Sequence, residues 1–196
     1  MVEISNITVS ELKESVIACR NAMRTEMPEY TEEEFDKSLP RAIKLVEASR
    51  NGVVKCHDNF LTGIRVSFDI VYPQYFTPQL QRYHFIDIVS SSSKDHRLSR
   101  IMEANCYNKY VSEEVKASVQ KYLDAYNANP SYENHMILLS NCPLGLQLFM
   151  RCSTNYMSLR NLYHQRIHDK LKEDWGAVLD MIRNLPYAED FITLGK

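Results

Sequence analysis

The chain has 196 residues, which is enough for one well-packed domain or at most two small ones. Its 44% hydrophobic and 24% charged residues are typical of a soluble globular protein. The formal net charge of −2 argues against duplex nucleic acid as the main partner, because such a partner usually requires a basic surface. No apolar run is long enough to span a bilayer, and the first residues lack the pattern of a signal peptide, so we expect a cytoplasmic protein that does not enter a membrane.

The cysteines and histidines do not favour a metal site. The five cysteines are odd in number and show no C-x-x-C spacing, which argues against structural zinc and a disulfide framework and favours reduced thiols; they are Cys19, Cys56, Cys106, Cys142 and Cys152. His164 and His168 are four residues apart on an expected helix, a spacing that can present two metal ligands. Gln165 and Arg166 follow the first histidine, however, so a solvated helix face is the favoured interpretation and no metal is expected.

In the N-terminal half, the patterns predict helices first and then a strand. Thr8-x-x-Glu11 resembles a capping box and predicts a helix to about Arg24. Thr31-x-x-Glu34 repeats the signal, and Pro40 suits the first turn of a helix over 41–49. From Gly63 to Ile70 apolar and polar residues alternate, which predicts a strand with one buried face that ends at Pro73.

In the C-terminal half, helical patterns surround a second strand. Ser112 can cap a helix that runs to about Asn127, and residues 146–152 alternate as a strand does. A helix is predicted from Thr154 or Asn155 to Arg166, and a last one carries Trp175 and ends before Pro186. We therefore expect one α+β domain over residues 1–196, mostly helical with a small central β-sheet.

The segment from Gln79 to Lys94 is the strongest candidate for a binding site. It reads Q-L-Q-R-Y-H-F-I-D-I-V-S-S-S-S-K, with a short helix expected near Pro78 and the serines expected in a loop. Arginine, lysine and hydroxyl groups in one short segment suit a phosphate, whose oxygens need several donors and positive charge. A solvated loop after a strand explains the same residues without a ligand.

Asn155 and Arg166 form a second candidate. Eleven residues turn a helix about three full times, so the two side chains share one face and could line one groove. The alternative is that Asn155 is only a cap and Arg166 only a surface charge. The chain contains no G-x-S-x-G, P-loop or G-x-G-x-x-G motif, which lowers the case for the enzyme classes that depend on them.

Taken together, these residues resemble a degenerate flavin-dependent thymidylate synthase of the ThyX family, over nearly the whole chain. Gln79-Leu80-x-Arg82 matches the family's Q-L-x-R, and Arg82-Tyr83-His84 followed by seven residues and Ser92 matches the frame of its R-H-R-x7-S motif. His57 matches a histidine before the strand, and Asn155 and Arg166 match an Asn and an Arg that are eleven residues apart. Trp175 lies about two residues from the family's tryptophan.

The match is better in spacing than in residue identity. Tyr83 replaces the motif histidine and His84 its second arginine. Ser90 stands where a glutamate is usual, and Lys94 where an arginine is usual. Further departures are Cys56, Asp87, Val89 and Asp95.

The resemblance implies a ThyX-like fold and a reaction that converts dUMP to its 5-methyl product. FAD, NADPH and methylenetetrahydrofolate would take part, the last as carbon donor. It implies that the nucleotide is held by Gln79, Arg82, Ser90, Ser92, Lys94 and Arg166, with Arg166 also beside the uracil ring as the catalytic residue. The flavin would contact His57 and Asn155, and Tyr83 could stack on a flat ring while His84 donates a hydrogen bond. A homotetramer with sites between subunits is also implied.

Two alternatives stay open. The substitutions at 83, 84, 87, 89 and 90 also suit a nucleotide-binding protein of this fold that has lost or altered the flavin chemistry. A purely structural or interaction role explains the composition but not the spaced polar residues.

Overall fold

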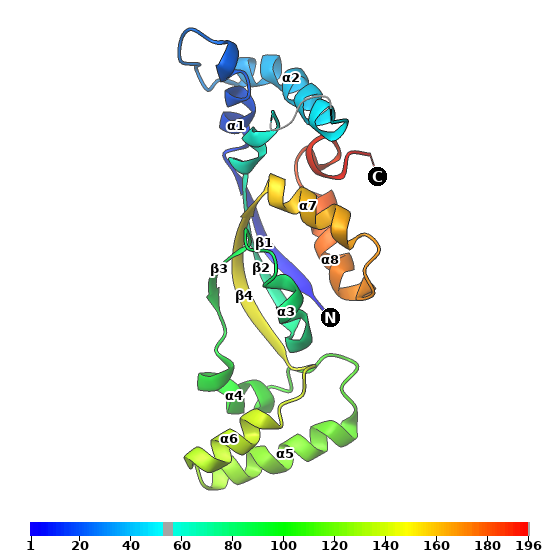
Figure 1. The fold of residues 1–196 in the computed structure, drawn as a ribbon. Coiled ribbons are helices and arrows are strands. Elements are labelled where there is room, and N and C mark those ends of the chain that lie inside the picture. Colours follow the sequence, from blue (N-terminus) through cyan, green and yellow to red (C-terminus); the bar gives the residue numbers. More distant parts are fainter. Residues whose placement is uncertain (53–56, 196) are drawn as a thin grey trace.

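A four-stranded antiparallel sheet is the centre of the molecule (Figure 1). The computed structural model describes residues 1–52 and 57–195. The strand order is β1-β2-β4-β3. The bounds are β1 (Glu3–Ser10), β2 (Arg65–Pro73), β3 (Asp87–Ser91) and β4 (Gln147–Asn155). β2 and β4 pair without interruption from Arg65 opposite Asn155 to Pro73 opposite Gln147, so the second strand leads directly into the next helix.

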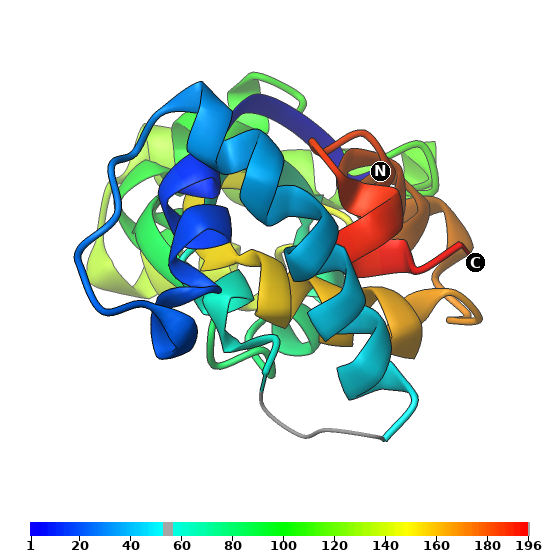
Figure 2. The same ribbon diagram turned by 90° about the horizontal axis from the view of Figure 1, so that it is seen from above.

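Helices cover one face of this sheet and both of its ends (Figure 1). α7 (Tyr156–Arg166) and α8 (Lys172–Arg183) lie over the face, with the short α3 (Thr77–Leu80) beside them. α1 (Leu12–Ala18) and α2 (Glu32–Arg50) form one end. Figure 2 shows α2 beside the C-terminal segment, which includes a π-helical turn over Glu189–Thr193. α4 (Lys94–Glu103), α5 (Glu113–Ala128) and α6 (Tyr132–Ser140) form the opposite end.

The core follows from the alternation in the two central strands. Val66, Phe68 and Ile70 of β2 are buried, as are Met150 and Cys152 of β4, while their chain neighbours are less buried. The buried residues pack against apolar side chains of α7 and α8, namely Tyr156, Leu159, Leu162, Trp175, Val178 and Ile182. One continuous buried cluster therefore fixes where α7 and α8 lie on the sheet.

The predicted α+β class, mostly helical with a small sheet, is confirmed, and so are its main elements. β2 begins two residues later than predicted and ends at Pro73, and β4 runs three residues beyond the predicted 146–152. Ser112 caps α5 through a bond from the Val115 amide (3.4 Å). α7 and α8 lie where they were predicted. The prediction of one domain over residues 1–196 stays a prediction.

The predicted first helix is wrong at its start. Thr8 lies in β1 opposite Ser67, and the helix covers only Leu12–Ala18. Glu11 precedes it with a left-handed φ of 60°, and no side chain caps its first turn. Pairing with β2 outweighs a local capping pattern, because the strand satisfies several backbone groups at once.

The predicted role of Pro40 is also wrong, because it lies inside α2 rather than in a first turn. The helix begins instead at the predicted cap Thr31, whose hydroxyl accepts from the Glu34 amide (3.2 Å). Burial of Phe35, Leu45 and Val46 on either side of the proline holds the helix together. Tertiary packing can outweigh the local cost of an interior proline.

Three further differences concern the candidate segment and its surroundings. Ser90 and Ser91 lie in β3 rather than in a loop, and Lys94 begins α4. The short helix near Pro78 was expected to carry both Gln79 and Arg82, but α3 ends at Leu80 and Arg82 follows it. β1, β3, α4 and α6 were not predicted.

None of the helices within residues 1–52 and 57–195 is long and apolar enough to cross a bilayer.

Candidate functional site

Arg166, the last residue of α7, is held by groups from three other segments. Its Nε donates to the Tyr83 hydroxyl (2.5 Å) and one terminal nitrogen donates to Gln79 Oε1 (3.3 Å). The same nitrogen forms an ion pair with Asp169 (2.5 Å), three residues further on. Only 17% of the Arg166 side chain is exposed, so its orientation is set by these partners rather than by solvent.

The ring of Trp175 packs against the guanidinium of Arg166 and forms part of this cluster. It is fully buried on α8, and the centre of the Arg166 guanidinium lies 4.4 Å from the ring centroid. The indole Nε1 donates to Gln79 Oε1 (2.8 Å), so one amide oxygen accepts from both Trp175 and Arg166. Tyr83 meets the indole edge-on with ring centroids 5.8 Å apart. A cation over an aromatic face and shared hydrogen bonds make this a rigid arrangement.

The charges in the cluster reinforce each other. Burial alone would lower the pKa of Arg166, but the hydrogen bonds that Arg166 donates to Asp169 and Tyr83 outweigh this effect, and the pKa lies above its ordinary value. Burial likewise favours protonation of Asp169, but the Leu171 amide and Arg166 hold the pKa of this carboxyl below its usual range. Arg166 therefore stays a cation and Asp169 a carboxylate at neutral pH.

A cavity of about 400 Å³ opens beside Arg166. It brings together four of the predicted site residues, Arg82, Tyr83, His84 and Arg166. It is completed by Phe85, a residue that is 73% exposed, and by three polar residues of α7 that sequence reasoning missed: Ser158, Asn161 and Gln165. These three residues follow Asn155 at steps of three, three and four, so helical spacing from Asn155 could have found them.

Asn155 acts as the helix cap. Its Oδ1 accepts from the Ser158 amide (2.9 Å) and the Ser158 hydroxyl (3.0 Å), and the side chain is nearly buried. Asn155 is not among the residues that line the cavity. It caps the start of α7 and is hydrogen-bonded to Ser158, which does line the cavity.

The serine and lysine part of the predicted site lies elsewhere on the same chain. Ser92 Oγ accepts from the Phe149 amide (3.1 Å), and Ser90 lies opposite Arg151. Lys94 donates to Gln74 (3.5 Å) and lines a different cavity of about 490 Å³ with Thr77 and Pro78 of α3. One chain thus presents two separate cationic positions, Lys94 in one cavity and Arg82 with Arg166 in another.

His57 lies in a third place. It is exposed and lines a cavity of about 570 Å³ between α2 and the segment that follows α1. Cys56, beside it in the sequence, lies outside the described residues. The structure does not bring His57 together with Arg166 in the same cavity.

His164 and His168 are the two histidines whose spacing on α7 and just after it could suit a metal. Within residues 1–52 and 57–195 no three side chains of the types His, Cys, Asp and Glu are grouped as a metal site would require. His164 instead contacts the ring of Tyr163, with centroids 5.6 Å apart.

Comparison with solved structures identifies the architecture. The flavin-dependent thymidylate synthase ThyX from Helicobacter pylori, solved with FAD and dUMP, superposes with a TM-score of 0.69 over 97% of this chain and 96% of that chain. The chain has the ThyX fold. The sequence identity is 18%, and a second structure of the same enzyme gives 19% with a TM-score of 0.68 over 98% and 97% of the two chains. The prediction of a ThyX-like architecture is thereby confirmed.

A more distant neighbour shares the ThyX fold. The UMP/dUMP methylase PolB from Streptomyces cacaoi, solved with 5-Br dUMP, superposes with a TM-score of 0.59 and 12% identity, over 98% of this chain and 91% of that chain. Neither a family model nor a curated protein matches the sequence. The likeness is therefore one of backbone arrangement rather than of overall sequence.

Proposed function

We propose that this protein is a divergent ThyX-like methyltransferase that converts dUMP, or a related pyrimidine nucleotide, to its 5-methyl product. FAD, NADPH and methylenetetrahydrofolate are the proposed cofactors and carbon donor. The observation that carries the proposal is the Arg166 cluster: a fixed guanidinium, held by Gln79, Tyr83 and Trp175, at the wall of a cavity that also contains Arg82. The ThyX fold supports it, since solved relatives of that fold were obtained with FAD and dUMP.

The cavity beside Arg166 has the chemistry that a flavin requires. Tyr83 and Phe85 offer flat apolar surface, Asn161 and Gln165 offer amide donors and acceptors, and Arg82 offers positive charge. A bound flavin would carry the hydride, while the protein would orient it and the nucleotide. His84 would donate to the flavin in this arrangement. His57 and Asn155 are proposed to approach it only in the assembled oligomer.

The nucleotide is proposed to bind through its phosphate and its base. Arg82, Lys94 and the hydroxyls of Ser90 and Ser92 would hold the phosphate, which needs several donors at once. Arg166, kept in place by Gln79, would lie beside the uracil ring and stabilise negative charge that develops on its oxygens.

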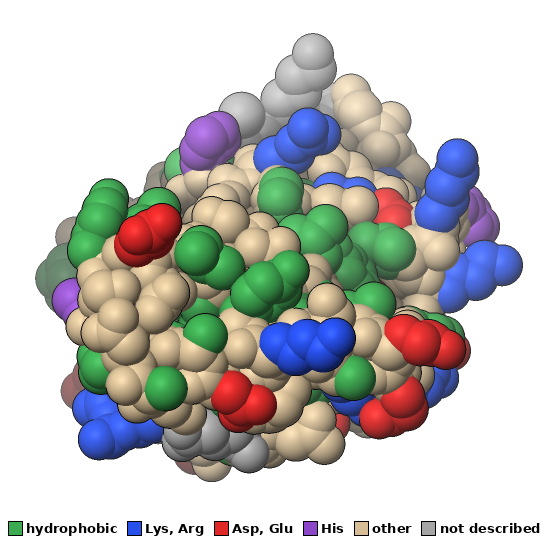
Figure 3. All heavy atoms as spheres, turned by 90° about the horizontal axis from the view of Figure 1, so that it is seen from below, with side chains coloured by type: hydrophobic (Ala, Val, Ile, Leu, Met, Phe, Trp, Pro, Cys, Tyr) green, Lys and Arg blue, Asp and Glu red, His purple; other side chains and the backbone are tan. Residues whose placement is uncertain are grey.

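We further propose that a complete site forms between subunits of a homotetramer. Lys94 and Arg166 line different cavities of one chain, so a second copy is required to unite them around one nucleotide. The end formed by α4–α6 supports an assembled state, because apolar side chains are exposed there (Figure 3). They include Val115, Tyr132, Met136, Ile137 and Leu144. Exposed apolar surface of this kind is typical of contacts between proteins. We propose a cytoplasmic location for the assembly.

A specific observation favours a second candidate function. The Tyr83 hydroxyl, which replaces the motif histidine, is already engaged by Arg166 and Gln165 (2.5 and 3.1 Å). A side chain bound internally in this way has less freedom to serve a cofactor. The second candidate is a pyrimidine-nucleotide-binding protein of the same fold without the flavin reaction.

Two measurements separate these functions. Flavin absorption bands in the purified protein, together with saturable uptake of FAD and dUMP, are expected for the methyltransferase. Growth of a thymidine-requiring bacterium on expression of the protein would confirm the reaction. A colourless protein that takes up dUMP but no FAD would rule out the methyltransferase and support the second candidate.

A further inference from the structure

A short 3₁₀ turn connects β2 to α3 and contacts the surroundings of both cationic positions. Its first residue, Gln74, accepts a hydrogen bond from Lys94 (3.5 Å). Its last residue, Phe76, is fully buried and packs against Trp175 with ring centroids 4.7 Å apart. Trp175 in turn lies against the guanidinium of Arg166. One short turn therefore joins the cavity lined by Lys94 to the Arg166 cluster.

The middle residue of the turn, Tyr75, is bound to α8. Its hydroxyl donates to Oδ2 of Asp174 (2.8 Å), the residue that precedes Trp175 on that helix. Consecutive residues of the turn thus contact consecutive residues of α8, Tyr75 on Asp174 and Phe76 on Trp175. Within the described residues, no side chain caps the start of α8. The contacts of its first turn, with Asp174 among them, therefore decide how Trp175 is placed.

Asp174 carries a buried carboxyl group whose two oxygens are both used. Only 4% of the residue is exposed, and its Oδ1 accepts from the backbone amide of Val2 (3.1 Å). A buried polar group costs free energy unless it is hydrogen-bonded, so the two donors keep the side chain in one orientation. Asp174 is not among the residues that line the cavity of Lys94 or the cavity of Arg166. It can therefore act on a ligand only through its neighbours.

The hydroxyl of Tyr75 remains a donor at neutral pH. Burial and the hydrogen bond to Asp174 raise the pKa of Tyr75 to about 12. The side-chain amide of Asn108 donates to the same oxygen (3.5 Å), so the hydroxyl gives one hydrogen bond and receives another. Tyr75 also lines the cavity of Lys94. The bond between Tyr75 and Asp174 therefore connects a wall of this cavity to the helix that carries Trp175.

We propose that Asp174 is a positioning residue of the nucleotide site. By holding Tyr75, it fixes the turn against α8, and so keeps Lys94 and Arg166 in the places from which they bind the nucleotide. This role rests on the proposed function, in which the two cations of one chain serve two different sites of the homotetramer. One bond in each subunit then orients groups in two neighbouring sites. Rigid support behind the residues that contact a ligand preserves their geometry.

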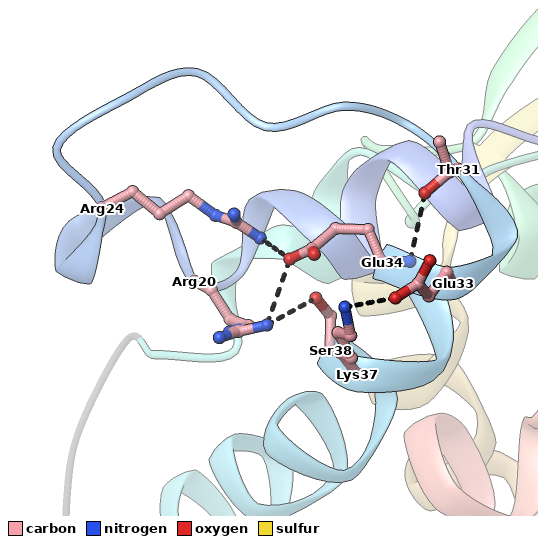
Figure 4. Close-up of polar contacts among 7 residues, drawn as sticks. All are labelled: Arg20, Arg24, Thr31, Glu33, Glu34, Lys37 and Ser38. Carbon is pink, nitrogen blue, oxygen red and sulfur yellow. Dashed lines mark hydrogen bonds and ion pairs between the residues drawn. The ribbon is translucent and has the colours of Figure 1, made fainter.

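Tyr75→Phe tests this role because it removes the hydroxyl and keeps the ring. Calorimetry with the assembled protein is expected to show a dUMP affinity about tenfold below that of the parent. The matched control is Thr31→Ala, which lowers stability by removing the hydroxyl that caps α2 (Figure 4), outside both cavities. Its dUMP affinity is expected to equal that of the parent. Binding by Tyr75→Phe as tight as that of the control would overturn the positioning role.

A double-mutant cycle tests whether the two residues act through their shared bond. Asp174→Asn keeps the size of the side chain but leaves one acceptor oxygen for two donors, so dUMP affinity is again expected to fall about tenfold. The double variant is expected to lose no more than either single variant, since the same bond is broken in all three. Losses that multiply to about a hundredfold would show independent action and contradict the proposal. The Tyr75→Phe comparison decides the question alone if Asp174→Asn fails to fold.

The parent protein separates failure of this role from failure of the proposed function. Saturable binding of dUMP by the parent is the expected baseline for every comparison. Absence of that binding would overturn the nucleotide site itself, and the role of Asp174 with it. Normal binding by both the parent and Tyr75→Phe would leave the proposed function standing and overturn only the positioning role.

Discussion

The Nε atom of Arg166 lies 2.5 Å from the hydroxyl oxygen of Tyr83, although 83 residues separate them in the chain. This contact joins the end of α7 to the segment that follows α3. It also places a tyrosine where the resemblance expects a histidine. The proposed function depends on whether that tyrosine only orients Arg166 or also contacts a ligand.

Tyr83→Phe removes the acceptor for Arg166 but keeps the ring against Trp175. A hydrogen bond to a charged group contributes about 1.5–3 kcal/mol. We therefore expect dUMP affinity, measured by calorimetry, to fall by about 10–100-fold as Arg166 loses its fixed orientation. Tyr110→Phe removes a comparable hydroxyl contact to Glu173 (2.8 Å) outside the cavity and serves as the control. Equal dUMP affinity in both variants would show that the Tyr83 hydroxyl has no part in binding.

Two substitutions of Gln79 are expected to separate stability from binding. Gln79→Ala leaves the buried Trp175 N–H without its acceptor and is expected to lower the free energy of unfolding by about 1–3 kcal/mol. Gln79→Glu keeps an acceptor for both partners, so urea denaturation is expected to show little loss. Its carboxylate offsets the charge of Arg166, and dUMP affinity is expected to fall at least about tenfold. A Glu variant that binds dUMP normally would argue against Arg166 as the base-contacting cation.

The buried pair of Asp58 and Arg160 predicts a pH-dependent stability. Asp58 is 3% exposed and Arg160 donates to it at 2.6 Å. Burial by itself would raise the pKa of Asp58, but bonds from Arg160 and Ser49 outweigh it and hold the pKa below its ordinary value. Because the pKa of Asp58 is lower in the folded than in the unfolded state, its ionised form adds to the free energy of unfolding above the unfolded-state pKa of about 3.9. This contribution is lost as the pH falls through the lower folded-state pKa.

Asp58→Asn is therefore expected to lower the free energy of unfolding by about 3–5 kcal/mol at pH near 7, because it leaves a buried guanidinium unpaired. The difference from the parent should narrow below a pH of about 4 in denaturation curves. Asp180→Asn breaks an exposed pair with Arg183 (2.7 Å) and is expected to cost about 0–1 kcal/mol. A gap that stays constant down to acid pH would contradict the assigned titration.

Pro40 predicts a stabilising substitution. It is exposed on the surface of α2 and removes one backbone hydrogen bond from the helix interior. Pro40→Ala is expected to raise the free energy of unfolding by up to about 3 kcal/mol, as measured by urea denaturation. A lower stability would mean that the proline ring supports the packing of α2 on its neighbours.

Mixing two inactive variants tests the shared site. Lys94→Ala and Arg166→Ala are each expected to abolish product formation from dUMP. If one nucleotide contacts Lys94 of one subunit and Arg166 of another, co-expression is expected to restore about a quarter of the activity, since that fraction of sites receives both intact residues. No recovery in a confirmed mixed oligomer would place both residues on the same subunit's site.

The sequence predicts the elements whose environment differs on two faces. β2 and β4 alternate because one face is buried, and α7 carries a buried stripe that ends at Arg166. β3 escapes prediction because all five of its residues are exposed, so no alternation arises. β1 contains an irregularity between Ser5 and Thr8, with Asn6 at a φ of 49°, which interrupts its period.

The same reasoning explains what could be anticipated of the candidate site. The helical spacing that links Asn155 to Arg166 also includes Ser158, Asn161 and Gln165. The residues of α7 that line the cavity could therefore have been predicted from the sequence. The separation of Lys94 from Arg166 could not be predicted, because no local pattern in the sequence tells which cavity each of the two residues will line. Likewise, no local pattern indicates that Tyr83, 83 residues earlier in the chain, binds Arg166.

Trp175 is the only tryptophan of the 196 residues, and it lies directly against Arg166 and Gln79. All intrinsic indole fluorescence of the protein therefore originates at this one cluster. Its emission maximum and intensity will respond to any ligand that displaces the guanidinium, and to unfolding of α8, without a label. A flavin bound in the neighbouring cavity would absorb that light by energy transfer, so loss of emission on addition of FAD reports proximity as well as binding.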